Sequence, residues 1–169
     1  MSQSVPPPQS GNPFADAPGT GPAAPQQPFP QAPAPARDNL VLGLLAALVA
    51  ALVGAGAYGG IGGALEREIG YAAVGVGLLV GFAAGKAGGR SPVLPVAAAL
   101  LSAGAVYLGQ LVTIAVLLGK MGEGSFTEVF FQNFGGVTEL WKLAADGMTY
   151  VFLAIGAVTA FAGARKGSA

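Results

Sequence analysis

The segment AAVGVGLLVGFAAGKAGG, residues 72–89, decides how this chain folds, because it is apolar apart from one lysine and carries a glycine at every fourth position. Glycine is the poorest ordinary helix former, so four glycines in register need a reason other than propensity. Residues four apart lie on one face of a helix. The stripe formed on that face contains Ala73, Gly77, Gly81 and Gly85. In lipid, small residues let two helix backbones approach closely, so the segment predicts a membrane helix that packs through this stripe.

The composition indicates a solvent other than water. The chain has 169 residues, of which 53% are hydrophobic and only 9% charged, whereas a soluble domain carries about 25% charged residues. The formal net charge is zero, so no overall field would attract nucleic acid. Without cysteine or histidine, the chain offers no disulfide, thiolate nucleophile or Cys/His zinc site. We therefore expect no catalytic residue, no cofactor, no metal and no nucleic-acid partner.

Residues 1–37 differ from the rest of the chain. They hold eleven of the thirteen prolines and five glutamines, and only two charged residues, Asp16 and Arg37. A segment with so little apolar surface to bury cannot offset its ordering entropy. We expect a disordered Pro/Gln-rich cytoplasmic tail. It is either a plain spacer or a docking strip for a cytoplasmic partner that reads polyproline segments.

Residues 38–169 contain four apolar runs that predict membrane spans. Their approximate bounds are 40–61, 69–85, 93–118 and 148–164. The two shorter runs could be buried helices of a soluble protein, but four runs with almost no charge inside argue against this. The sequence thus predicts an all-α, polytopic membrane protein with four transmembrane helices and an outer loop over 119–147.

The first apolar run carries a second stripe of small residues. Its members are Gly43, Ala47, Ala51, Ala55 and Gly59. Two stripes on consecutive helices predict that the first two helices pack closely as an antiparallel hairpin. The stripes could pack within one chain or between two chains, and the sequence leaves both alternatives open. A nucleotide-binding loop is a poor alternative, because Gly75-Val76-Gly77 is followed by glycine at 81, one place too late for GxGxxG, and Ala87 follows Lys86 where a P-loop needs Ser or Thr.

The charged residues indicate an orientation. The tail, the 86–92 turn and the C-terminus carry five basic residues, and the other two loops carry three. The positive-inside rule then places both termini in the cytoplasm.

Three polar residues lie together in the third run. Tyr107, Gln110 and Thr113 are each about one helical turn apart. An unpaired amide in hydrocarbon is costly, so Gln110 should face the bundle or a partner. Its role is either an interhelical hydrogen bond or a polar point on a substrate or ion path.

The outer loop predicts two short amphipathic helices. Ser125-Phe126-Thr127-Glu128 fits a capping box, and apolar residues recur with helical spacing over 137–144, which includes Trp141. We expect these helices on the outer membrane surface, with Trp141 as an interfacial anchor at headgroup level. Capping the bundle and contacting a partner are the alternatives.

Residues 71–83, YAAVGVGLLVGFA, resemble a signature of the form aromatic-x-A-[IV]-G-[IV]-G-x-[LV]-V-G-x-A. It is found in an uncharacterised family of small four-helix bacterial integral membrane proteins. The tail, with Asn12-Pro13-Phe14-Ala15, resembles tails on membrane proteins of high-GC Gram-positive bacteria. The resemblance implies four helices over about residues 40–166 and a bacterial plasma membrane. It implies no activity.

The function expected from these patterns is non-enzymatic. Small-residue stripes and a docking-capable tail favour a scaffold or accessory subunit, in contact with the lipid bilayer, that assembles as a homo-oligomer or with a membrane protein partner. The alternative is an oligomeric channel or passive facilitator whose path is lined by Tyr107, Gln110 and Thr113. A membrane enzyme would need carboxylates from the outer loop, and we do not expect one.

Overall fold

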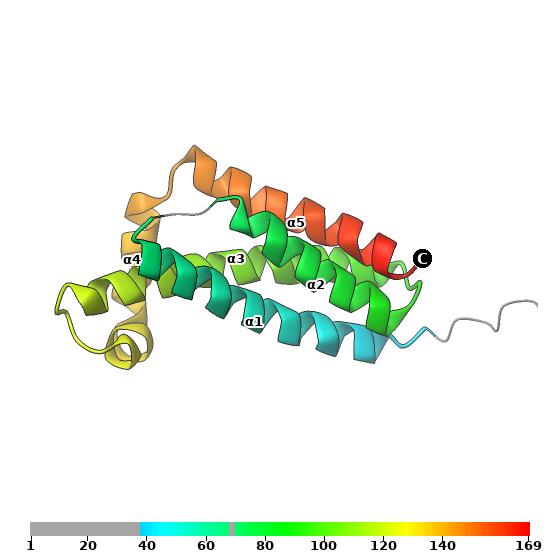
Figure 1. Ribbon diagram of the computed structural model, residues 1–169, viewed down its shortest axis with the longest axis horizontal. Coiled ribbons are helices and arrows are strands. Elements are labelled where there is room, and N and C mark those ends of the chain that lie inside the picture. The colour runs from blue at the N-terminus through cyan, green and yellow to red at the C-terminus, as the bar shows by residue number, and fades with distance from the viewer. Residues whose placement is uncertain (1–37, 68–69) are drawn as a thin grey trace, which may run out of the picture. The chain divides into compact units, whose positions relative to one another are not determined.

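The computed structural model describes residues 38–67 and 70–169, and in these it is all-α (Figure 1). The predicted tail, residues 1–37, and the pair Glu68 and Ile69 lie outside the described residues. The elements in chain order are α1 (Leu40–Leu65), α2 (Ala72–Gly88), α3 (Val93–Lys120), a π-helical turn η1 (Glu128–Gln132), α4 (Phe134–Ala144) and α5 (Gly147–Gly167).

Three of these helices have the length and apolarity needed to cross a membrane. They are α1 with 26 residues, α3 with 28 and α5 with 21. Helix α2 is apolar but has only 17 residues, about 26 Å at 1.5 Å per residue, which is shorter than the roughly 30 Å hydrocarbon core. The chain is therefore a multi-span membrane protein with three long helices and a shorter one. Each helix extends beyond or shifts from its predicted run by only a few residues.

The helices run in two opposite directions. The backbone N–H of Asn39 donates to the Gly88 carbonyl across 3.1 Å, which places the start of α1 beside the end of α2. The Arg90 Nε–H donates to the Ser168 carbonyl at 3.3 Å, which brings the C-terminus of α5 to the same place. We call this the tail end. The ends of α1 and α3, together with η1, α4 and the start of α5, form the opposite loop end (Figure 1).

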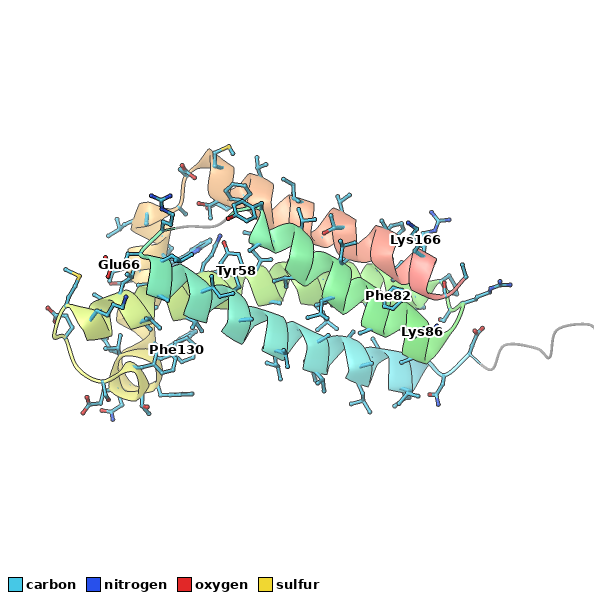
Figure 2. All side chains as sticks on the ribbon, in the orientation of Figure 1. Tyr58, Glu66, Phe82, Lys86, Phe130 and Lys166 are labelled. Atoms are coloured by element: carbon cyan, nitrogen blue, oxygen red, sulfur yellow. The ribbon has the colours of Figure 1, made fainter. Side chains whose placement is uncertain are left out.

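The buried interior is built mostly from small residues, and many of the large apolar side chains face outward. Among the residues with almost no exposure are Ala47, Ala73, Ala84, Ala98 and Ala160, whereas Leu100 is 72% and Val158 67% exposed. In water this distribution would be unstable, but lipid is as apolar as leucine, so outward leucines cost little and close backbone packing stabilises the bundle. The side chains in Figure 2 project from the outer faces of the helices.

The glycine stripe of α2 packs against α5, not against α1. A Cβ at Gly81 would overlap the backbone of Ala160, and one at Gly85 would overlap that of Ala164. At Gly77 it would overlap Gly156 and Thr159. Successive glycines along α2 meet successive residues along α5, so the two helices run parallel.

The stripe of α1 is shared between two neighbours. At its start, Gly43 lies against Leu94 of α3 and Gly88 of α2; near its end, Gly59 lies against Val112 and Gly109 of α3. The members between them, Ala47, Ala51 and Ala55, are all buried. The prediction that α1 and α2 pack closely as an antiparallel pair is confirmed, because Gly43 lies against Gly88 and the start of α1 meets the end of α2. The two stripes do not meet along their whole length, however: at Gly59 the α1 stripe meets α3, and the glycine stripe of α2 meets α5. Small residues define a face and do not select the helix that it meets.

Candidate functional site

The polar residues of α3 gather at the loop end, beneath α4. The indole Nε1–H of Trp141 donates to the Gln110 Oε1 at 2.7 Å. The ring of Tyr107 meets the Trp141 ring edge-on with centroids 4.7 Å apart, and the Tyr150 ring of α5 lies 6.2 Å from it. Trp141 thus joins three helices, and the interhelical hydrogen bond expected of Gln110 is present.

Gln110 is almost wholly buried, with 2% of its surface exposed. Its Oε1 accepts the Trp141 bond, while its Nε2 has no hydrogen-bond partner among the residues the structure describes. An unsatisfied buried donor of this kind costs about 1–3 kcal/mol. The amide is therefore only half satisfied, in the most polar part of an otherwise apolar bundle.

Thr113 uses its hydroxyl within the bundle. Its Oγ1 donates to the backbone carbonyl of Gly109 one turn earlier at 3.1 Å, and lies 3.4 Å from the carbonyl of Gly59 on α1. A side chain at Gly62 of α1 would overlap the Thr113 hydroxyl, so the glycine there allows this approach. Thr113 consequently acts as a bridge between α1 and α3 at the close contact made by the small-residue stripe.

A cavity of about 240 Å³ opens beside this cluster at the loop end. Polar residues from four elements line it: Glu66, Arg67, Gln110, Thr113, Trp141 and Thr149. Its remaining wall is apolar, with Ile114, Leu117 and two alanines. The volume far exceeds the roughly 15 Å³ that a single water needs. Sequence reasoning found Gln110, Thr113 and Trp141 but missed Glu66, Arg67 and Thr149, since no pattern links residues so far apart in the chain.

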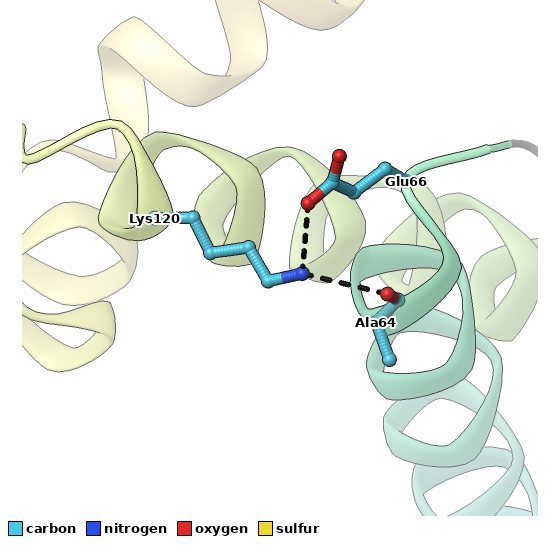
Figure 3. A network of polar contacts seen from close by, with 3 residues as sticks. All are labelled: Ala64, Glu66 and Lys120. Atoms are coloured by element: carbon cyan, nitrogen blue, oxygen red, sulfur yellow. Dashed lines mark hydrogen bonds and ion pairs between the residues drawn. The ribbon is translucent and has the colours of Figure 1, made fainter.

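The outer wall of the cavity is held by an ion pair (Figure 3). The Lys120 Nζ lies 3.1 Å from Glu66 Oε1 and also donates to the Ala64 carbonyl at 3.4 Å. The ammonium group at the end of α3 thereby donates to a terminal carbonyl of α1. A positive charge at the C-terminus of a helix also interacts favourably with the helix dipole. Glu66 ends α1 in the left-handed region, with φ 53°, and Arg67 N–H bonds back to Gly62 O.

The loop helices cover the end of α3. Val129 of η1 and Val137 of α4 are buried in one cluster with Leu111 and Ala115 of α3. The predicted capping box is confirmed, because Ser125 N–H donates to Glu128 Oε2 at 2.8 Å and Glu128 N–H donates to Ser125 Oγ at 3.3 Å. The Ser125 backbone N–H and the Ser125 hydroxyl, which donates to the same Oε2 at 2.9 Å, lower the pKa of Glu128 below its usual value. The two helices therefore cap the bundle; contact with a membrane surface stays a prediction.

A second cap starts α5 and was not predicted. The Asp146 Oδ1 accepts from Thr149 N–H at 2.9 Å and from Thr149 Oγ1 at 3.0 Å. The same hydrogen bonds, led by the backbone one, lower the pKa of Asp146. The signal was present in Asp146-Gly147-Met148-Thr149, a capping residue with a hydroxyl three positions later.

The contacts of this site are hydrogen bonds and ring contacts between helices. Within residues 38–67 and 70–169, no three His, Cys, Asp or Glu side chains come together as metal ligands would. The cluster can hold helices together, and its cavity can admit a small molecule.

Comparison with protein-family models, curated proteins and solved structures finds no match. The resemblance of residues 71–83 to a family of small membrane proteins therefore stays an expectation. What the structure supports is a small helical membrane protein with three long apolar helices and a shorter one.

Proposed function

We propose that this chain is a four-span protein of a bacterial plasma membrane that acts as a non-enzymatic scaffold or accessory subunit. The observation that carries this proposal is the hydrogen bond between Trp141 and Gln110, because it uses the most polar side chain of the bundle to fasten the loop-end cap. Other interior hydroxyls also join two helices: Ser102 of α3 donates to the Gly156 carbonyl of α5 at 2.9 Å, and the Thr113 hydroxyl of α3 lies 3.4 Å from the Gly59 carbonyl of α1. Because these polar side chains form hydrogen bonds between helices, they favour a structural role.

Four crossings with both termini in the cytoplasm fit the arrangement of the helices. Although α2 is short, it returns from the loop end to Asn39, so it covers most of the distance that α1 covers. Basic residues gather at the tail end, where Figure 2 shows Lys86 and Lys166, while Glu66 lies at the loop end. The positive-inside rule assigns the tail end to the cytoplasm.

Single-cysteine labelling tests this topology cleanly, because the chain has no cysteine of its own. We expect Glu123→Cys to react with a membrane-impermeant maleimide in intact cells, and a cysteine placed at Ala169 to react only after permeabilisation. The reverse pattern would overturn the orientation. Reaction of both positions in intact cells would contradict an even number of crossings.

The exposed apolar residues of the loop end are the surface on which we expect a membrane partner. Phe131 of η1 is 71% exposed and Leu143 of α4 is 84% exposed, although both helices lie outside the long apolar spans. Purification in a mild detergent, followed by the mass of the complex and identification of its components, should give a stoichiometric partner or a defined homo-oligomer. Leu143→Ser should release the partner, whereas Glu139→Ala on the same helix should not. A monomer with no retained component would contradict the scaffold role.

A passive path is the second candidate, and the cavity beside Gln110 is the observation that favours it. Purified protein in liposomes should be assayed for the flux of glycerol and of small ions. Flux that is lost in Gln110→Leu but retained in Gln110→Asn would support the path. The absence of flux in the wild-type protein would leave the scaffold role as the better explanation.

A further inference from the structure

The tail end carries a second hollow whose chemistry differs from that of the loop-end cavity. Its volume is about 470 Å³, and it lies between the start of α3 and the end of α5. Two guanidinium-bearing residues line it, Arg90 and Arg165, with Pro92, Pro95 and Phe161 as its apolar wall. Cationic and apolar groups therefore meet in one concave surface.

Arg90 is held in place by two contacts with distant parts of the chain. Its backbone N–H donates to Asp38 Oδ1 at 2.7 Å, and its side-chain Nε–H donates to the Ser168 carbonyl at 3.3 Å. The Ser168 Oγ donates in turn to the carbonyl of Arg165 at 3.0 Å. Arg90 thus lies against the last turn of α5 beside Arg165. The Asp38 carboxylate thus contacts the backbone of Arg90 and forms no ion pair with its guanidinium.

Neither arginine forms an ion pair within the part of the chain that the structure describes, where the ion pair formed is that of Glu66 and Lys120 at the other end. The Arg165 Cζ lies 5.7 Å from the centre of the Phe161 ring, a cation–π contact that positions it against an apolar wall. Lys86 and Lys166 add charge at the same end of the bundle (Figure 2). The hollow is therefore lined by two exposed guanidinium groups, at an end of the bundle that also carries two lysines.

We propose that this hollow binds the phosphate headgroup of an anionic phospholipid. It lies at the end of membrane-length helices, which is the depth of the headgroups. A guanidinium offers a planar fork of donors that matches phosphate oxygens in pairs. Basic pockets between membrane helices hold anionic headgroups by this chemistry. Pro92, Pro95 and Phe161 offer the apolar contact that the glycerol and upper acyl carbons need. The inference requires only that the chain spans a membrane, not the proposed scaffold role.

Native mass spectrometry of the full chain in mild detergent tests the proposal, with phosphatidylglycerol, phosphatidylcholine and inorganic phosphate as separate probes. We expect retained phosphatidylglycerol and much less phosphatidylcholine. The double variant Arg90→Gln/Arg165→Gln should bind phosphatidylglycerol at least about tenfold more weakly, since each lost charged hydrogen bond is worth roughly a factor of ten. Lys142→Gln, which removes an exposed cation of α4 at the loop end, is the control and should bind as the wild type does. Arg90→Lys/Arg165→Lys should lie between, because it keeps the charge and loses the fork.

Three results would overturn the proposal. Undiminished phosphatidylglycerol binding by the double variant would show that the arginines do not form the site. An equal loss in Lys142→Gln would show that binding follows overall charge. Displacement of the lipid by equimolar inorganic phosphate would identify a site for free anions instead. Helix content and monodisperse elution confirm that each variant folds. If the double variant does not fold, Arg165→Gln alone provides the same test, because it leaves both contacts of Arg90 intact.

Discussion

Trp141 donates its indole N–H to Gln110 across 2.7 Å, and this bond joins a helix outside the apolar spans to the loop-end half of the longest membrane helix. The relationship is unusual because it leaves the other half of the amide, Nε2, without a partner among the described residues. If the Trp141 bond is removed, the whole amide becomes unsatisfied in a buried position. The contribution of the bond should therefore exceed that of an ordinary neutral hydrogen bond.

Trp141→Phe should lower the free energy of unfolding by about 1–3 kcal/mol, the cost of a buried acceptor left unsatisfied. Phenylalanine keeps an aromatic ring to pack against Tyr107, so the loss reports mainly the N–H donor. The measurement is unfolding in mixed micelles of mild detergent and SDS, followed by helix content.

A double-mutant cycle with Gln110→Leu separates this bond from packing. In the leucine background no acceptor remains, so Trp141→Phe should cost clearly less than in the wild type. Equal costs in the two backgrounds would mean that Trp141 stabilises the cap only through its ring contacts with Tyr107 and Tyr150.

Two glycines of α2 provide a matched test of the close contact with α5. Gly81→Ala should destabilise the bundle by about 1–3 kcal/mol, because its new methyl group would overlap the backbone of Ala160 and overpacking against backbone is not easily relieved. Gly75→Ala, on the same helix, meets nothing within 4 Å and should be neutral or gain up to about 1 kcal/mol from helix propensity. Unfolding of both variants in mixed micelles decides the matter. Equal effects would show that α2 and α5 do not pack through this stripe.

The contrast between these glycines also shows what the sequence could predict. Spacing of apolar and small residues predicted the helices, the stripe on α2 and the capping box at Ser125, because each depends on residues within a few positions of one another. It did not predict that Gly81 meets Ala160 or that Gln110 meets Trp141, because several helices offered a suitable face or donor. The choice among them depends on how the loops direct each helix, and Lys120 contributes to that through contacts with Ala64 and Glu66 that no local pattern reveals.

Glu66 occupies a backbone conformation that glycine adopts more easily. With φ 53°, it is the one non-glycine residue of positive φ in the described ranges, and such a position costs an ordinary residue about 1 kcal/mol or more relative to glycine. Its ion pair with Lys120 is largely exposed and worth about 0–1 kcal/mol. Glu66→Gly should therefore leave the unfolding temperature unchanged or raise it, although the ion pair is lost.

Glu66→Ala removes the same ion pair without relieving the strain, so it should lower the unfolding temperature relative to Glu66→Gly. Lys120→Met, which removes the ion pair and the contact with the Ala64 carbonyl but leaves the backbone of Glu66 unchanged, should lie below the wild type. If glycine and alanine at position 66 behaved alike, the left-handed end of α1 would carry no measurable strain.

The cap at the start of α5 should make the stability of the protein depend on pH in a predictable direction. The hydrogen bonds from Thr149 lower the pKa of Asp146 below its ordinary value of 3.8 in the folded protein, so the unfolded chain binds a proton more readily. The stabilisation is therefore fully present above about pH 4, declines as the pH falls towards the lowered pKa, and is absent below it.

Asp146→Asn keeps a capping side chain but cannot titrate. The unfolding temperatures of wild type and Asp146→Asn, measured from pH 7 to pH 2, should differ at neutral pH in favour of the wild type, where the carboxylate also complements the helix dipole, and should converge in acid. The capping carboxylate Glu128 titrates in both proteins and cancels from the difference. A gap between the two proteins that stays constant down to pH 2 would show that the Asp146 carboxylate gains nothing from Thr149.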